Sequence, residues 1–136
     1  MNTKEINIQV LALLGDAVFS LYIREKLLKL GINNPNILQQ KQVEYVSAKS
    51  QVKILERLIR EEKLSIEEQD IVKRGRNNKK DNHPKNTDIM TYKLSTGFEA
   101  LLGDLYLNDK KRLEEILSLI EVKRWKYMEK MLPWKN

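Results

Sequence analysis

The chain has 136 residues and a formal net charge of +6, which fits one domain and favours polyanionic partners, nucleic acid before acidic membrane surfaces. It contains no cysteine, which excludes a disulfide framework and a thiolate zinc site, and we expect a cytoplasmic protein. No apolar run approaches the roughly 20 residues of a membrane span, so we expect no membrane partner.

Apolar residues recur at helical spacing along most of the chain, and glycine and proline are scarce. We therefore predict an all-α fold in a single domain over residues 1–136. The first helix is predicted to begin at Asn2, with Glu5 as its capping-box partner, and to stop near Gly31. Its apolar residues fall on one broad stripe: Ile6, Val10, Leu13, Leu14, Ala17 and Leu21.

Further helices are predicted where a capping residue precedes an apolar period, and a second helix should follow Pro35. The expected caps are Ser47 for a third helix, Ser65 with Glu68 for a short fourth, and Thr87 or Asp88 for a fifth. The last predicted helix carries Leu113, Ile116, Leu117, Ile120, Trp125 and Met128.

The pattern breaks at residues 73–85, KRGRNNKKDNHPK, which contain six lysines and arginines, one acid and no apolar residue. We predict a basic, flexible loop at about 73–87. Such a run is ordinarily a solvated loop, but here we favour contact with RNA, which proteins hold mainly through phosphates and 2′-hydroxyls. The candidate RNA-binding residues are Arg74, Arg76, Asn77, Asn78, Lys79, Lys80, His83 and Lys85. Lys49 and Lys53 form a second candidate phosphate-contacting face, which solvent exposure explains equally well.

Two acids stand in apolar surroundings. Asp16 is the only side chain expected to be charged between residues 10 and 23, and we expect it at the edge of the core. Glu99 has a comparable setting on a helix that packing could bring beside the first. The two could share one Mg²⁺, or Mn²⁺ in its place, because Mg²⁺ keeps several waters and needs only one or two protein carboxylates. From spacing alone, the alternative is that Asp16 caps a helix restarting after Gly15 and that Glu99 pairs with a lysine.

The five-residue sequence ALLGD occurs twice, at residues 12–16 and 100–104. Each copy puts an acid, Asp16 or Asp104, inside an apolar helix, where an unpaired carboxylate would cost several kcal/mol. Asp104 follows Glu99 by five residues, about 140° around a helix, so the two do not point at one metal. We therefore assign Asp104 to structure.

The sequence around the two acids resembles the signatures of the ribonuclease III family. Residues 14–18, LGDAV, look like the motif in which that family has Gly-Asp-Ala-Val, and residues 98–103, FEALLG, look like its second acidic motif. The order and separation of the motifs also match, across essentially the whole chain. The resemblance implies that Asp16 and Glu99 face each other and help to bind catalytic Mg²⁺.

Two departures fall beside these acids. Most family members have a glutamate where this chain has Ala12, and an aspartate where it has Thr96. The same reduced pattern resembles the Mini-III subgroup, as do residues 45–49 (YVSAK), 74–77 (RGRN) and 85–88 (KNTD). Members of that subgroup are active ribonucleases without a double-stranded RNA-binding domain, so we expect no such domain here.

The resemblance implies a helical bundle, the ribonuclease III catalytic domain, acting as a homodimer in which each subunit hydrolyses one strand of double-stranded RNA. By similarity to Mini-III, the substrate would be the precursor of large-subunit (23S) ribosomal RNA, with a large-subunit ribosomal protein as a further candidate partner. The first alternative is a catalytically inactive relative that binds RNA in ribosome assembly, which Ala12 and Thr96 support. The second is a basic helical adaptor for DNA or protein, in which Asp16 and Glu99 have no joint role.

Overall fold

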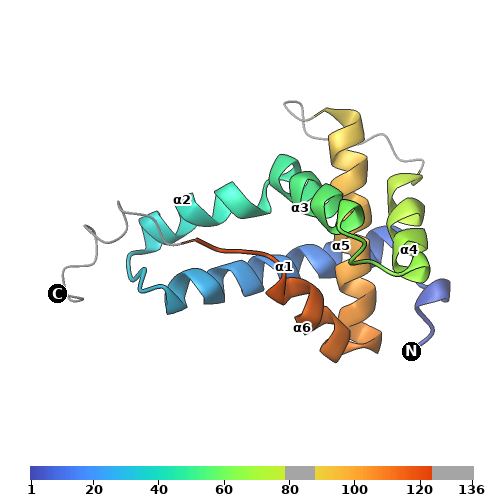
Figure 1. The fold of residues 1–136 in the computed structure, drawn as a ribbon, viewed down its shortest axis with the longest axis horizontal. Coiled ribbons are helices and arrows are strands. Elements are labelled where there is room, and N and C mark those ends of the chain that lie inside the picture. Colours follow the sequence, from blue (N-terminus) through green and yellow to red (C-terminus); the bar gives the residue numbers. More distant parts are fainter. Residues whose placement is uncertain (79–87, 124–136) are drawn as a thin grey trace.

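The computed structural model describes residues 1–78 and 88–123, and all of its regular elements in those ranges are helical, as the sequence predicts. A short 3-10 helix, η1, opens the chain (Figure 1). The elements are η1 (Thr3–Glu5), α1 (Ile8–Lys29), α2 (Pro35–Val46), α3 (Ala48–Arg60), α4 (Ile66–Arg76), α5 (Ile89–Asn108) and α6 (Lys110–Ser118). None of these helices is both long and apolar enough to cross a membrane.

The helix α5 lies at the centre of the fold. It stands upright in Figure 1, with α1 crossing it and α3 and α4 packed beside it, while α2 runs back along α1. Phe19 of α1 and Phe98 of α5 are fully buried and meet edge to face, with ring centroids 5.6 Å apart. The core around them therefore joins the two helices that carry the predicted acids.

Most helices begin where a local capping signal stands in the sequence. Ser65 and Glu68 form the predicted capping box of α4, and the predicted caps Ser47 and Asp88 accept backbone N–H groups at the starts of α3 and α5. Asn34, just before Pro35, caps α2. At the end of α1, Gly31 has a φ of 101°, a left-handed conformation that favours glycine.

The start of the first helix was predicted wrongly. Asn2 does act as a cap, but of the 3-10 turn η1, through a hydrogen bond from the backbone N–H of Lys4. A second asparagine, Asn7, caps α1 by accepting from the backbone N–H of Gln9. The chain thus forms a capped 3-10 turn and then a separately capped α-helix, and Glu5 belongs to the 3-10 turn.

The apolar stripe predicted for the first helix lies largely on the surface. Val10, Leu13 and Leu21 are 55%, 72% and 66% exposed, and Ala17 is exposed too. The buried residues of α1 lie on another face: Leu11, Ala12, Gly15, Phe19, Ile23 and Leu27. Since α1 is apolar on both faces, its periodicity could not tell which face packs against α5.

The last helix is shorter than predicted, because α6 ends at Ser118 and the buried Ile120 follows it outside the helix. Trp125 and Met128 lie outside the described residues.

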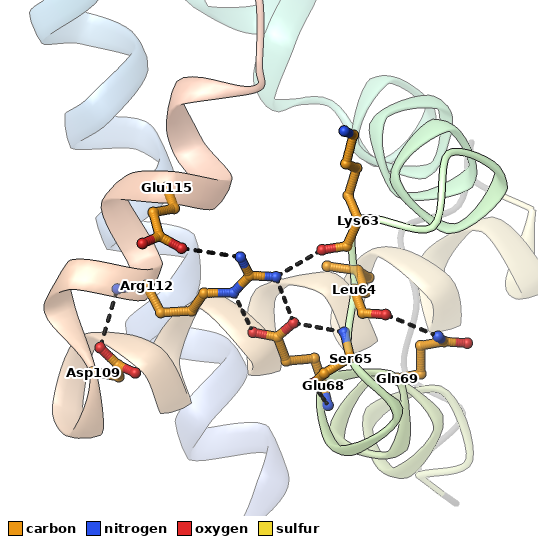
Figure 2. A network of polar contacts seen from close by, with 8 residues as sticks. All are labelled: Lys63, Leu64, Ser65, Glu68, Gln69, Asp109, Arg112 and Glu115. Carbon is orange, nitrogen blue, oxygen red and sulfur yellow. Dashed lines mark hydrogen bonds and ion pairs between the residues drawn. The ribbon is translucent and has the colours of Figure 1, made fainter.

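Arg112 links α6 to the start of α4 and to the turn before it (Figure 2). Its guanidinium donates to both carboxylate oxygens of Glu68 at 2.8 and 2.9 Å, and to the carbonyl of Lys63 at 2.7 Å.

Candidate active site

The crossing of α1 and α5 depends on two glycines, one from each copy of the ALLGD sequence. A Cβ atom on Gly15 would lie 1.7 Å from the backbone oxygen of Glu99, and one on Gly103 would lie 2.0 Å from the backbone oxygen of Leu11. Because backbone atoms cannot move aside as a flexible side chain can, only glycine permits this approach. The two copies of the repeat therefore meet each other at the crossing.

This approach brings the two predicted acids together, since Asp16 follows Gly15 and the backbone that Gly15 touches is that of Glu99. Both carboxylates line a cleft of about 310 Å³, which we call the acidic cleft. Its lining residues are Gln9, Ala12, Leu13, Asp16, Gly75, Asn78, Tyr92, Lys93, Thr96 and Glu99. Asp16 is exposed at the cleft, whereas Glu99 is half-buried.

The electrostatics of the pair are unfavourable without a cation. Burial, followed by the neighbouring carboxyl of Asp16, raises the pKa of Glu99 to about 8, although a hydrogen bond from Gln51 acts in the opposite direction. Without a cation, these effects therefore favour the protonated form of Glu99. Asp16 does not cap a restarted helix, because α1 continues without a break through Gly15. Among the described residues, no lysine forms an ion pair with Glu99.

These two carboxylates suit a magnesium ion better than a metal ion that takes all of its ligands from the protein. Within residues 1–78 and 88–123, no group of three or more His, Cys, Asp or Glu side chains is placed to hold a metal. Two carboxylates in an open cleft are the ligands that Mg²⁺ takes when waters and substrate phosphates complete its coordination. A cation between Asp16 and Glu99 would also remove the repulsion that raises the pKa of Glu99.

A second pair of glycines brings α4 onto α5. A Cβ atom on Gly75 would lie 2.6 Å from the Cα of Gly97, and one on Gly97 would lie 2.3 Å from the backbone oxygen of Val72. The C-terminal end of α4, with its basic residues, consequently lies beside the acidic cleft. A neighbouring groove, the basic groove, is lined by Ile6, Asn7, Ile8, Gln9, Lys73, Arg74, Asn77 and Asn78.

The two hollows adjoin, because Gln9 and Asn78 line both of them. Of the candidate RNA-binding residues, Arg74 and Asn77 line the basic groove, while Arg76 is half-buried and donates to the side chain of Asn77 at 3.1 Å. The remaining candidates, Lys79, Lys80, His83 and Lys85, lie outside the described residues. Residues 73 to 76 were predicted to belong to the basic loop, but they form the last turn of α4.

The structure also describes the other residues that the sequence singled out. Lys49 and Lys53 are exposed on α3 and line neither hollow. Asp104 is 9% exposed and accepts from the side chain of Asn108 at 3.5 Å, which agrees with its assignment to structure. Ala12 and Thr96 line the acidic cleft, so the side chains that replace the usual acids lie beside the retained ones.

Sequence reasoning missed two residues at the site. Lys93 is the only lysine or arginine among the described residues that line the acidic cleft, and it makes no ion pair with them. It stands three residues before Thr96, a spacing that puts the two side chains on one helical face and that could have been noticed. Gln51 donates to Glu99 from α3, and no sequence signal marks it.

Comparison with known proteins identifies the family to which this fold belongs. Residues 9–110 match the ribonuclease III domain. The chain is 43% identical to Mini-ribonuclease 3 of Enterococcus faecalis, over 85% of this chain and 88% of that protein. It is 44% identical to Mini-ribonuclease 3 of Streptococcus pneumoniae, over 83% and 89% of the two chains. A crystal structure of a protein from Fusobacterium nucleatum superposes with a TM-score of 0.73 at 32% identity, covering 87% of this chain and 93% of that one.

These matches span most of both chains, and the chain belongs to the ribonuclease III family, within the Mini-ribonuclease 3 group.

Proposed function

We propose that the acidic cleft is the active site of a divalent-metal-dependent endoribonuclease that hydrolyses double-stranded RNA. Membership of the ribonuclease III family makes the chain an endoribonuclease. The observation that carries the assignment of the site is the meeting of Asp16 and Glu99 in one cleft, across a crossing that only glycine allows. Water is the nucleophile, and no covalent intermediate with the protein is needed.

Asp16 and Glu99 would hold the metal, for which Mg²⁺ is the first candidate and Mn²⁺ a substitute. When bound, the ion would lower the pKa of a bound water and stabilise negative charge on the scissile phosphate. The carboxylate of Asp16 is open to the cleft, and that of Glu99 is backed by the protein. The pair would thus provide oxygen ligands from two helices that pack against each other.

The residues around the acids would hold the RNA backbone. Lys93 is suited to a phosphate within the cleft, because the described residues leave its ammonium without an ion pair. Arg74, Asn77 and Asn78 continue this polar surface along the basic groove, where they can bond to phosphates or to 2′-hydroxyls. We include Arg76, Lys79, Lys80, His83 and Lys85 in the same surface on sequence grounds, with Lys49 and Lys53 as more distant phosphate contacts.

We propose a homodimer, because α1 carries an unpartnered apolar face. Val10, Leu13, Leu21 and Leu28 are each more than half exposed along this helix, and a row of exposed apolar side chains is typical of a protein–protein contact. Leu13 also lines the acidic cleft, so a second copy on this face would border the active site. Two clefts, each cutting one strand, would then face one RNA duplex.

The dimer is tested by sedimentation, which should give about twice the monomer mass of 16.1 kDa. Leu21→Glu should produce monomers with little cleavage activity, since it puts a charge in the apolar face. Ile66→Glu is the matched control, because Ile66 is 75% exposed on α4 and outside this face. A fully active Leu21→Glu monomer would refute the two-site arrangement.

The physiological substrate proposed is the precursor of 23S ribosomal RNA, with a large-subunit ribosomal protein as a further partner. The support is similarity to the Mini-ribonuclease 3 proteins. The second candidate function is an inactive RNA-binding relative in ribosome assembly. It is favoured by Ala12 and Thr96, because the described lining of the cleft then has two carboxylates rather than four.

One experiment separates these functions: incubation of the purified protein with a long RNA duplex, with and without Mg²⁺, followed by mapping of the product ends. Cleavage that needs Mg²⁺ and leaves 5′-phosphates is expected. Asp16→Asn and Glu99→Gln should each lower the rate about a thousandfold, because several kcal/mol of charge stabilisation are lost, while melting and RNA binding stay near wild type. Wild-type cleavage by either variant would contradict the site, and RNA binding without any cleavage would favour the inactive relative.

A further inference from the structure

Gln51 is a polar residue in a place where α3 is otherwise packed into the core. It is 2% exposed. Its Nε2 donates two hydrogen bonds, one to the backbone carbonyl of Val46 at 3.0 Å and one to Oε2 of Glu99 at 3.2 Å. Its own oxygen, Oε1, is buried and has no hydrogen-bond partner among the described residues.

The orientation of the Gln51 amide follows from its two partners. The backbone carbonyl of Val46 can only accept, so it must be met by the NH₂ group, whose second hydrogen is directed at Oε2 of Glu99. Turning the amide around would put Oε1 against the carbonyl oxygen of Val46. The arrangement therefore satisfies Val46 and Glu99 and leaves Oε1 unpaired.

A buried oxygen without a partner is unfavourable, and an apolar side chain of the same length would avoid it. The benefit of an amide at this position must therefore come from the groups that it binds. Val46 is the last residue of α2, and its carbonyl accounts for one hydrogen of the amide. The other hydrogen is directed at a carboxylate that lines the acidic cleft.

Gln51 itself does not line the acidic cleft, so it contacts Glu99 from within the protein. Its hydrogen bond holds one oxygen of the Glu99 carboxyl group from the side away from the cleft. A ligand carboxylate held on one oxygen has fewer orientations to lose when a metal binds.

We propose that Gln51 is a positioning residue, which holds the Glu99 carboxylate in the orientation that binds the catalytic cation. This inference rests on the proposed function, because it requires Glu99 to be a metal ligand. A merely structural Gln51 would serve only the corner between α2 and α3 through the carbonyl of Val46.

The test compares Gln51→Met, which keeps the length of the side chain and removes the donor, with the wild-type protein. Binding of Mn²⁺ to the RNA-free protein is measured by electron paramagnetic resonance, and cleavage is measured across a Mg²⁺ titration. We expect Gln51→Met to bind Mn²⁺ about 10- to 100-fold more weakly, the range typical when a group behind a metal ligand is lost. Excess Mg²⁺ should restore kcat, and KM for RNA at saturating Mg²⁺ should stay unchanged.

Gln42→Met is the matched control. Gln42 is also a buried glutamine, 7% exposed, but its hydrogen bond is to Arg24 at 2.5 Å and it does not line the acidic cleft. It should lower the melting temperature without changing the Mn²⁺ affinity. If Gln51→Met fails to fold, Gln51→Asn serves instead, because an amide one methylene shorter cannot reach Val46 and Glu99 together.

The possible outcomes distinguish the role of Gln51 from the existence of the metal site. If the wild-type protein binds Mn²⁺ and Glu99→Gln weakens this binding, but Gln51→Met or Gln51→Asn binds as tightly as wild type, then Gln51 is only structural. If Glu99→Gln binds Mn²⁺ as well as the wild-type protein does, then the metal site itself is wrong. Weaker Mn²⁺ binding by the Gln51 variant, with the Gln42 control unchanged, supports the inference.

Discussion

The central helix α5 is crossed at two glycine pairs. Acidic side chains lie beside one crossing and basic side chains lie beside the other. At Gly15 and Gly103, α1 lies against α5 and two carboxylates are brought together. At Gly75 and Gly97, α4 lies against α5 and its basic end is brought to the edge of the same cleft. One helix thus positions both the acids proposed to bind the metal and the cations proposed to bind the RNA.

The crossings differ in how directly they determine the site. Gly15 touches the backbone of Glu99 itself and is followed by Asp16, so any change in this spacing moves both carboxylates. Gly75 touches Gly97, whose backbone bears no site residue directly. The basic residues near this crossing have long, flexible side chains in the last turn of α4 or follow α4 in the sequence. We therefore expect the first crossing to determine metal binding and cleavage, and the second to determine the affinity for RNA.

The largest effect on cleavage is expected from Gly15→Ala. The added Cβ would lie 1.7 Å from the backbone oxygen of Glu99, so α1 and α5 must separate. We expect a loss of about 3 kcal/mol or more in the free energy of unfolding, at the upper end for overpacked cores, together with the loss of Mn²⁺ binding and cleavage. Urea denaturation and Mn²⁺ titration measure the two effects. Ser20→Ala, on the same helix, is the control, and a Gly15→Ala protein with normal cleavage would disprove the role of this crossing.

A smaller effect, of a different kind, is expected from Gly75→Ala. Its Cβ would lie 2.6 Å from the Cα of Gly97, so α4 must shift while α1 stays against α5. We expect a loss of about 1 to 3 kcal/mol in stability and weaker RNA binding, with Mn²⁺ affinity close to wild type. Gel shifts on duplex RNA and Mn²⁺ titration test the separation. Equal loss of metal binding in Gly75→Ala and Gly15→Ala would show that the crossings are not independent.

Arg74→Ala removes a cation from the basic groove without disturbing either crossing, because its side chain is exposed. If it contacts one phosphate, the slope of log affinity against log salt should fall by about 0.7 to 0.9. Cleavage at saturating RNA should change little. Arg60→Ala is the matched control, since Arg60 is exposed at the end of α3 and lines neither hollow. The same slope for both variants would remove Arg74 from the RNA-binding surface.

The smallest effect on cleavage is expected at the other end of α4, where Glu68 pairs with Arg112 (Figure 2). The hydrogen bonds from Arg112 lower the pKa of Glu68 below its usual 4.5, so the unfolded chain binds more protons as pH falls. The stabilisation is present above about pH 4.5 and is lost as pH falls through the folded-state pKa. Glu68→Gln should cost about 1 to 3 kcal/mol at pH 7, and urea denaturation should show the cost shrinking below pH 4.5. A cost independent of pH would exclude the ion pair as its cause, and metal binding should not change.

Local signals in the sequence predicted much of the helix pattern. The caps Ser47, Ser65 and Asp88 were found because each bonds to backbone only three residues away. The same locality explains the error at the first helix, where Asn2 and Asn7 both satisfy the cap pattern and a 3-10 turn separates them. Resemblance to a family, rather than spacing alone, then singled out Asp16 and Glu99.

Tertiary structure alone decided which surfaces of these helices meet. Both faces of α1 are apolar, so sequence periodicity could not show that Leu13 and Leu21 face outward while Phe19 and Ile23 are buried in the core. The repeated ALLGD sequence did not reveal that its two glycines touch, because that contact depends on the crossing of two helices. Gln51 and Glu99 are 48 positions apart, and their hydrogen bond exists only because α3 packs on α5. Local sequence sets where a helix begins and ends, whereas the acidic cleft depends on contacts between helices distant in the chain.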